Sequence, residues 1–387
     1  MLLVFFEQLE AFLSAESIAA LGKITLRAAL AALLGFLPAV LLGRFWIRCL
    51  KRRFREPNKS ASPTLNELHA DKDKTPTMGG LVVLVGLISA TLLLADLTNR
   101  YVQVAIFIAI GFGTIGAIDD LTKLTRAKNG ISARGKFWLQ VAIATIAALL
   151  LYQHKLQSPD GPVCNLLIVD HGLHLGFWFV PLAVLAIVGT SNAVNLTDGL
   201  DGLAGGCLIF AIGAMTPVVY ACGHAGLADY LGLHGVTGVG ELAVFGGAMI
   251  GGVLGFLWFN CHPAEVFMGD TGSLPLGGLL AVLAVASGLE LLLIIVGGVF
   301  VLETVSVIMQ VGWFKLTRKR IFRCAPIHHH FQFAGHSETK IVVRFWIAAA
   351  LCAAAGLALL KVNIHDSAPG GQQPIHVASE IDGTTIH

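Results

Sequence analysis

A long uncharged stretch that ends in two adjacent aspartates constrains this chain more than any other feature. Residues 102–118 carry no charge, and Asp119, Asp120 and Lys123 follow. An apolar helix needs about 20 residues, at about 1.5 Å each, to cross the hydrocarbon of a bilayer. Two carboxylates at its end repel each other, and Mg²⁺ is a good partner because it binds one or two carboxylates together with substrate phosphates. For this pair alone, a solvated helix end is an equal alternative.

The composition predicts that the whole chain belongs to a membrane. Of its 387 residues, 55% are hydrophobic and only 13% are charged, whereas soluble domains carry about 25% charged residues. We therefore predict an all-α, polytopic integral membrane protein with about ten transmembrane helices. Residues 1–362 would form a single transmembrane domain, and residues 363–387 a polar, disordered outer tail. The seven cysteines are scattered without a Cys-x-x-Cys pair, so no disulfide framework is indicated.

Apolar runs predict the spans, and basic residues predict their orientation. The predicted spans are 24–47, 79–96, 102–118, 137–152, 175–193, 202–222, 241–259, 273–287, 289–313 and 342–361. Loops 48–78, 119–136 and 315–341 hold eight, five and six Lys and Arg residues, while each connection on the opposite side holds one or none. Because cytoplasmic loops carry the excess of Lys and Arg, we expect both termini outside. Loops 194–201 and 260–272 then also face the cytoplasm.

The loop after the fifth span holds two carboxylates three residues apart. Asp198 and Asp201 would share one face of a helical turn, and Gly199 between them would let the backbone approach a ligand closely. An ordinary turn and helix N-cap contain the same residue types. The segment alone therefore leaves a binding loop and a simple turn as alternatives.

The segment Phe-Met-Gly-Asp-Thr-Gly-Ser places Asp270 at the start of a predicted helix. Backbone N–H groups at such a position can bind phosphate, although a capped turn has the same pattern. Before the second span, Lys72 and Lys74 would either anchor the helix at the membrane interface, which is the usual role of such residues, or hold phosphates. Both segments lie in predicted cytoplasmic loops.

Three successive histidines occupy the last cytoplasmic loop. His328, His329 and His330 could bind a metal, transfer protons or hydrogen-bond phosphate oxygens. A zinc site with Cys324 is disfavoured, because adjacent histidines rarely share one tetrahedral ion. Within the ninth span, Glu303 and Gln310 are expected to line a cleft or to be structural, since polar groups inside a membrane face a bundle interior or a cavity.

Acids that recruit a divalent cation therefore gather with lysines and histidines at one membrane surface. Phosphate chemistry on a substrate embedded in lipid fits this set. Two phosphorylated reactants repel each other, and a metal ion with lysines removes that barrier, because positioning and charge stabilisation dominate phosphoryl transfer. A nucleic-acid partner is not expected.

Five runs in this chain resemble those of the bacterial phospho-N-acetylmuramoyl-pentapeptide transferases, within the polyprenyl-phosphate N-acetylhexosamine-1-phosphate transferase superfamily. They are DKTPTMGG (73–80), IDD (118–120), SNAVNLTDGLDGLAGG (191–206), FMGDTGSLPLGG (267–278) and APIHHHFQ (325–332). The resemblance covers roughly residues 20–362, in the same order and on one predicted face. One departure is Gln332, where this branch typically has Glu; it puts little in doubt, since the histidines are present.

The resemblance implies a reaction and a set of site residues. UDP-N-acetylmuramoyl-pentapeptide and undecaprenyl phosphate would give lipid I and UMP with Mg²⁺, at the cytoplasmic face of the bacterial plasma (inner) membrane. The resemblance also implies a homodimer. The implied catalytic residues are Asp119, Asp120, Asp270, His328, His329 and His330, and the three aspartates would also hold the metal. The implied substrate-binding residues are Lys72, Lys74, Thr77, Lys123, Lys136, Asn192, Asn195, Asp198, Gly199, Leu200, Asp201, Asn260, Phe267 and Gln310.

Two other functions compete with this interpretation. The same chemistry on UDP-GlcNAc is the nearest alternative, and the triple histidine and the TPTMGG run argue against it. A transporter or flippase could also have ten spans and an intramembrane Glu303, but its polar groups should lie near the midplane. In this chain the polar groups gather at one end of the predicted bundle.

Overall fold

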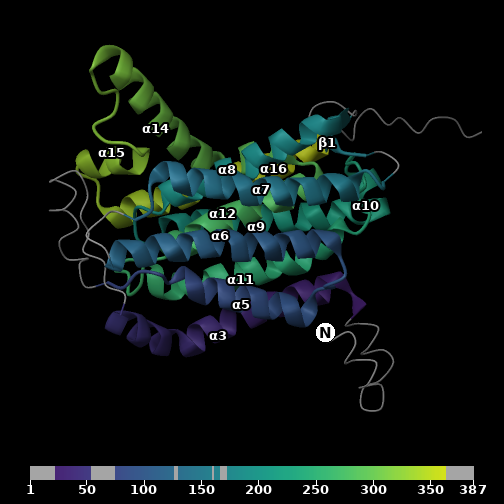
Figure 1. Cartoon of the computed structure of the whole chain (residues 1–387), viewed down its shortest axis with the longest axis horizontal. Coiled ribbons are helices and arrows are strands. Elements are labelled where there is room, and N and C mark those ends of the chain that lie inside the picture. The colour runs from purple at the N-terminus through teal and green to yellow at the C-terminus, as the bar shows by residue number, and fades with distance from the viewer. Residues whose placement is uncertain (1–21, 54–74, 126–129, 159–160, 166–171, 363–387) are drawn as a thin grey trace, which may run out of the picture.

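The computed structural model describes residues 22–53, 75–125, 130–158, 161–165 and 172–362, which form a bundle of long helices (Figure 1). The long helices, in chain order, are α3 (Ile24–Arg53), α5 (Gly80–Leu94), α6 (Arg100–Thr125), α7 (Ala133–Lys155), α8 (Phe179–Thr197), α9 (Leu203–Cys222), α11 (Leu242–Asn260), α12 (Asp270–Ser287), α14 (Gly298–Thr317) and α16 (Glu338–Val362). Short elements complete it: β1 (Val163–Asn165), β2 (Gly172–His174), η2 (Gly176–Trp178), α10 (Ala225–Tyr230), η3 (Val239–Glu241), α13 (Glu290–Val296) and α15 (Ile327–Phe333).

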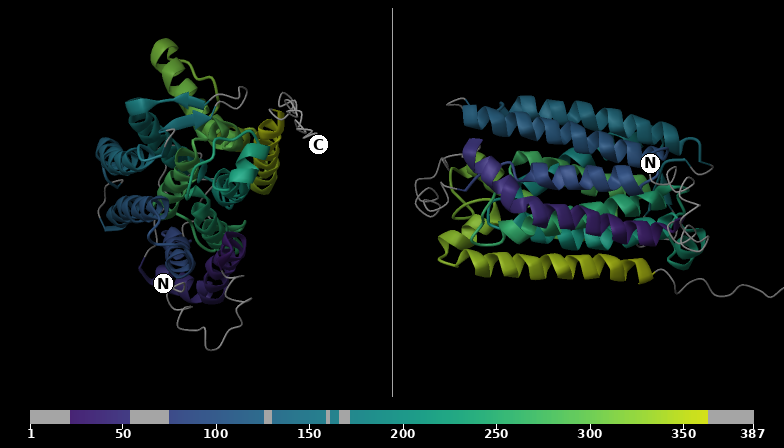
Figure 2. Two further views of the ribbon diagram at one scale, coloured as in Figure 1. Left: turned by 90° about the vertical axis from the view of Figure 1, so that its right-hand side faces the viewer. Right: turned by 90° about the horizontal axis from the view of Figure 1, so that it is seen from below.

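The predicted all-α membrane fold is confirmed. Within the described residues, nine helices are long and apolar enough to cross a membrane, and the apolar helix Gly80–Leu94 is shorter. These helices run alternately up and down, so α3 begins and α16 ends at the same end of the bundle (Figure 2). The only strands of the described part, β1 and β2, have three residues each and pair in antiparallel orientation. The predicted outer tail and the N-terminal segment before residue 22 lie outside the described residues.

Helix α12 forms the centre of the bundle. Every one of its residues is buried, and it packs against α6, α8, α9 and α5. A helix that is apolar on all sides belongs in such a core. Glycines permit the close approach: a Cβ on Gly277 would lie 2.6 Å from the carbonyl oxygen of Thr190, and one on Gly278 would lie 3.0 Å from the Phe112 ring. Small residues serve the same purpose in membrane helix interfaces generally.

The predicted ninth span is wrong as a single helix. Residues 289–313 form α13 and α14, separated at Gly297. A Cβ on Gly297 would lie 2.7 Å from the carbonyl oxygen of Leu293, so this break requires glycine. Figure 1 shows α14 leaving the bundle at an angle. The short helix α15 contacts α14 through His328, which lies beside Glu303. The predicted ninth span is therefore two helices, of which α14 carries Glu303 and Gln310.

Candidate active site

Three carboxylates meet at one end of the bundle. Asp119 and Asp120 lie in the last two turns of α6, and Asp270 is the first residue of α12. All three are buried, with exposed fractions of 1%, 0% and 7%. Each offers an oxygen within 4.8 Å of the others, a spacing that could hold a metal ion. The sequence separates these acids by 150 residues, and the packing of α12 against α6 brings them together.

The close contact between α6 and the start of α12 depends on two glycines. A Cβ on Gly116 would collide with the backbone of Asp270. Gly269 has a φ of 71°, a conformation that favours glycine, and a Cβ there would lie 2.6 Å from Asp120 Oδ2. Thr77 lies beside the same glycine, since its hydroxyl would be 2.9 Å from that Cβ.

Asp120 is engaged mainly by the protein itself. Its Oδ1 accepts from the N–H of Asp270 at 3.2 Å, and its Oδ2 accepts from the N–H and the hydroxyl of Thr271 at 3.0 and 2.7 Å. These bonds satisfy the free N–H groups at the start of α12, as an N-cap does. Asp120 therefore fixes α12 against α6, while Asp119 and Asp270 face the centre of the site.

Two lysines lie among the three carboxylates. Lys123 Nζ is 3.1 Å from Asp119 Oδ2, 3.6 Å from Asp120 Oδ1 and 3.3 Å from Asp270 Oδ1. Lys136 Nζ, from the first turn of α7, is 3.2 Å from Asp119 Oδ2 and 2.6 Å from Asp270 Oδ2. Buried carboxylates need such partners. The two ammonium groups occupy positions where a divalent cation would find carboxylate oxygens, so the residues present fit Mg²⁺. The ammonium groups themselves are suitable partners for a substrate phosphate.

The loop after α8 adds a fourth acid. Burial raises the pKa of the Asp198 carboxyl well above its usual range, and the negative charges of Asp270, Asp120 and Asp201 raise it further. Its neutral form is thereby favoured while no cation or ligand is present. Asn195 lies one turn earlier on α8 and is half-buried, and its carbonyl accepts from the Asp198 N–H. Leu200 is buried in the core.

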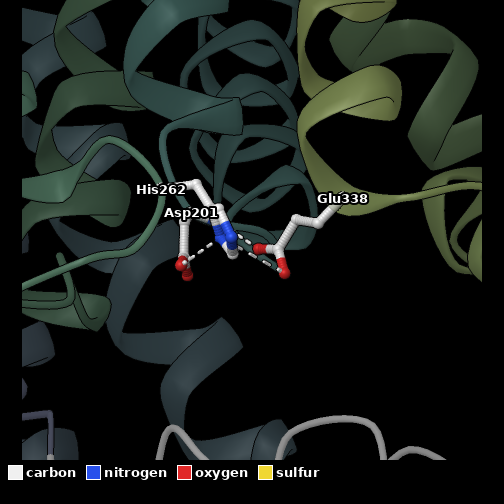
Figure 3. A group of neighbouring side chains, drawn as sticks. All are labelled: Asp201, His262 and Glu338. Atoms are coloured by element: carbon white, nitrogen blue, oxygen red, sulfur yellow. Dashed lines mark hydrogen bonds and ion pairs between the residues drawn. The ribbon is translucent and has the colours of Figure 1, made fainter.

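Asp201, in the loop after α8, contacts residues of two other elements (Figure 3). Its Oδ2 contacts His262 Nδ1 at 3.2 Å and accepts from the Ala264 N–H at 3.1 Å, while its own N–H donates to Glu338 Oε1 at 2.8 Å. Asn260 also braces this region, because it accepts from the Gly202 N–H and donates to the carbonyl of Val266. These bonds tie the loop after α8 to the segment that leads to Phe267.

Phe267 is half-buried, and its backbone hydrogen-bonds to the segment that precedes α5. Its N–H donates to the carbonyl of Pro76, and its carbonyl accepts from the N–H of Gly79, both at 2.8 Å. These two hydrogen bonds hold the TPTMGG run against the start of α12. Asp201, Asn260 and Phe267 therefore belong to one connected wall beside the acids.

The three histidines have three different surroundings. His328 is fully buried and contacts Glu303. His329 Nδ1 lies 2.7 Å from Gln332 Oε1, so the residue that departs from the family pattern is a direct histidine partner. His330 Nδ1 accepts from the N–H of Arg323. The rings therefore are not one cluster that converges on a single ion.

Two residues expected to bind substrate are engaged elsewhere, and two lie outside the described part. Asn192 donates to Gln140 on α7 and to the carbonyl of Val188. Gln310 binds the backbone of Ile321 and Phe322. Lys72 and Lys74 fall outside the described residues. Sequence reasoning missed His262 and Glu338, because a lone histidine and a helix-starting glutamate carry no signal in the sequence.

Comparisons with known proteins agree with this geometry. The glycosyl transferase family 4 model matches residues 102–288, which include the three aspartates. A phospho-N-acetylmuramoyl-pentapeptide-transferase of Koribacter versatilis is 44% identical over 358 residues, which are 88% of this chain and 94% of that protein. Another with the same name, from Solidesulfovibrio magneticus, is 48% identical over 301 residues, 76% of this chain and 82% of that protein. This membrane protein therefore belongs to the phospho-N-acetylmuramoyl-pentapeptide-transferase family.

Proposed function

We propose that this enzyme transfers phospho-N-acetylmuramoyl-pentapeptide from its UDP carrier to undecaprenyl phosphate, giving lipid I and UMP. The observation that carries the proposal is the group of three carboxylates and two lysines at the end of a membrane bundle. Relatives that cover most of the chain bear the name of this activity. The location lets a water-soluble nucleotide meet a lipid whose phosphate lies at the membrane surface.

The lysines are the groups we assign to the phosphates. Lys123 and Lys136 each contact two or more carboxylates now, and a diphosphate that enters the site offers the same kind of oxygen partner. Their positive charges reduce the repulsion between nucleotide and lipid phosphate, and they stabilise charge that develops in the transition state. Lys72, Lys74 and Thr77 would extend this phosphate site from the segment before α5.

Asp119, Asp120 and Asp270 would hold Mg²⁺. When bound, this ion supplies charge neutralisation on the phosphate oxygens. Asp119 and Asp270 face the lysines, whereas Asp120 keeps its bonds to the start of α12. We assign metal binding chiefly to Asp270 and orientation of the lipid phosphate to Asp119.

Direct attack by the lipid phosphate accounts for the chemistry without a covalent enzyme intermediate. A phosphate monoester has a second pKa of about 6, so it is largely dianionic at neutral pH. One of its oxygens forms a bond to the sugar-linked phosphorus, and the bond from that phosphorus to UMP breaks. Isolation of a phosphosugar–aspartate adduct in the absence of lipid phosphate would contradict this route in favour of two-step covalent catalysis.

The nucleotide would bind beside the acids. The residues that we assign to it are Asn195 in the last turn of α8, then Asp198, Gly199, Leu200 and Asp201 in the following loop, and Phe267. His329 and His330 would close the pocket. Loops 119–136 and 315–341 are rich in Lys and Arg, and Lys123 and Lys136 of the first of these loops lie at the acids, so the positive-inside rule supports a cytoplasmic active site in the inner membrane. We further propose one catalytic domain over residues 1–362 and a homodimer.

The decisive test is UMP release by purified protein given UDP-N-acetylmuramoyl-pentapeptide and undecaprenyl phosphate, with and without Mg²⁺. Mg²⁺-dependent release that Asp270→Asn abolishes is the expected result. Release from UDP-GlcNAc instead would move the substrate to the other branch of the superfamily. No release with either nucleotide sugar would contradict the proposal.

A further inference from the structure

Glu303 is a buried carboxylate that the proposed chemistry does not use. It lies in the second turn of α14 and is 0% exposed, as is His328. Glu303 Oε2 lies 3.1 Å from His328 Nδ1. Among the described residues, neither Glu303 Oε1 nor His328 Nε2 has a hydrogen-bond partner. A buried polar pair with two unmet hydrogen-bonding atoms is costly and calls for a functional explanation.

The other edge of the His328 ring touches the loop after α8. A Cβ placed on Gly199 would collide with His328 Nε2 and lie 2.9 Å from Cε1. The ring therefore presses against the backbone of Gly199, which stands between the acids Asp198 and Asp201. One imidazole thus links α14 to the loop that we assign to the nucleotide.

The segment that carries the histidines contacts α14 at two residues, Glu303 and Gln310. Gln310 accepts from the N–H groups of Ile321 and Phe322 and donates to the carbonyl of Phe322. Gln310 therefore holds the backbone that leads to α15, whereas Glu303 holds a single ring. The hydrogen bond between Glu303 Oε2 and His328 Nδ1 fixes the orientation of the ring.

We propose that Glu303 is a positioning residue: through His328 it sets the position of Gly199 and so the affinity of loop 198–201 for a uridine nucleotide. This inference rests on the proposed function, because it takes that loop as the nucleotide site. Water cannot replace the carboxylate where both partners are fully buried. Loss of the acceptor frees the ring to turn, and the loop loses the surface against which it packs.

The test compares Glu303→Leu, which removes the acceptor, with Glu303→Gln, whose amide oxygen retains it. Binding of UDP to each purified variant is measured by calorimetry, and KM is measured for both substrates. We expect Glu303→Leu to weaken UDP binding by about tenfold, the lower end of the effect of removing the partner that orients a metal-bound histidine. KM for the nucleotide sugar rises with it, while KM for the lipid phosphate stays unchanged. Glu303→Gln restores both values to near those of the unmodified enzyme.

Glu290 provides the matched control. It is also a buried glutamate whose two carboxylate oxygens have no hydrogen-bond partner among the described residues, and it lies at the start of α13, at the opposite end of the bundle. Glu290→Leu removes a comparable buried carboxylate, and we expect it to leave UDP binding unchanged. A purely structural effect of losing such a group would instead appear in both variants.

A second variant keeps the test decisive if Glu303→Leu does not fold. His328→Asn retains a donor toward Glu303 and removes the edge that faces Gly199, so it should also weaken UDP binding. UDP binding equal to that of the unmodified enzyme in folded Glu303→Leu or in His328→Asn overturns the positioning role. If the unmodified enzyme binds no UDP and releases no UMP, the proposed function fails first, and this inference fails with it.

Discussion

The ammonium group of Lys136 lies 2.6 Å from Asp270 Oδ2, so a residue in the first turn of α7 neutralises the first residue of α12. The same ammonium reaches Asp119 on α6. Lys136 therefore joins the ends of three helices, although 134 residues separate it from Asp270 in the sequence. Attractive contacts of this kind hold the carboxylates together before any substrate arrives.

Lysine and Mg²⁺ should therefore compete for the same oxygens. Lys136→Met removes one positive charge from the three carboxylates, which leaves them under-neutralised. We expect the variant to be less stable without metal and to gain more thermal stability from added Mg²⁺ than the unmodified enzyme does, because a ligand that binds only the folded state stabilises it. Thermal unfolding of purified protein across a Mg²⁺ titration measures both effects. Equal gains in the two proteins would contradict the shared site.

Asp119 and Asp120 are adjacent in the sequence but should differ on substitution. Asp120 accepts three hydrogen bonds from Asp270 and Thr271, so Asp120→Asn should lower the free energy of unfolding by about 1–3 kcal/mol. Asp119 accepts one backbone bond, from the N–H of Ile131, and its partners Lys123 and Lys136 also contact Asp270, which would still neutralise them in a variant at Asp119. Asp119→Asn should retain more stability while abolishing UMP release. Chemical denaturation of both variants, with Ser89→Ala on α5 as a surface control, measures the difference.

A third prediction concerns a buried ion pair at the opposite end of the bundle. Arg27 Nη2 lies 2.9 Å from Glu241 Oε2, and Arg27 also donates to the carbonyl of Leu94. Removing one partner of such a pair leaves an uncompensated buried charge, so Arg27→Met should cost about 3–5 kcal/mol of stability. Arg27→Met combined with Glu241→Leu should recover much of this loss. A double-mutant cycle on thermal unfolding tests it, and additive losses would show that the two side chains are not coupled.

The sequence predicted the membrane fold and the three aspartates for a physical reason. A span must hide its backbone and carry apolar side chains along its length, so hydropathy alone marks most helices, and acids at the ends of apolar runs stand out. The break at Gly297 escaped prediction because α13 and α14 are both apolar and only the packing around Leu293 shows that the helix ends. Arg27 and Glu241 were likewise invisible as a pair, since nothing in either span identifies the partner.

Within the site, the sequence predicted which kinds of residue are present, but not which residues they hydrogen-bond. Asn192 and Gln310 belong to motifs that resemble a binding site, yet their amides bond to Gln140 and to the backbone of Phe322. An amide that can bind a ligand can equally brace a loop, and only the fold distinguishes the two. The conformation of the loop after α11 brings His262 to Asp201, and no local sequence pattern specifies that conformation.

Asp198 allows a prediction about pH. Burial and three nearby acids raise the pKa of its carboxyl well above the ordinary value, so the folded protein binds a proton there more tightly than the unfolded chain does. The sign follows from linkage: stability is favoured at low pH and decreases as pH rises from the unfolded pKa, about 3.9, through the raised folded pKa. Asp198→Asn removes this penalty, because the amide is neutral at every pH.

In the absence of Mg²⁺ and nucleotide, we therefore expect Asp198→Asn to be more stable than the unmodified enzyme at pH 8 and to have lost this advantage at pH 4. Unfolding temperatures measured across that range in the presence of a chelator check the trend. Leu196→Ala, an exposed position on the same turn of α8, controls for general effects. The same Asp198→Asn variant should bind UDP more weakly, since a group placed for function at a cost in stability is expected to lose function when that cost is relieved. Stability that did not depend on pH in the comparison would contradict the raised pKa.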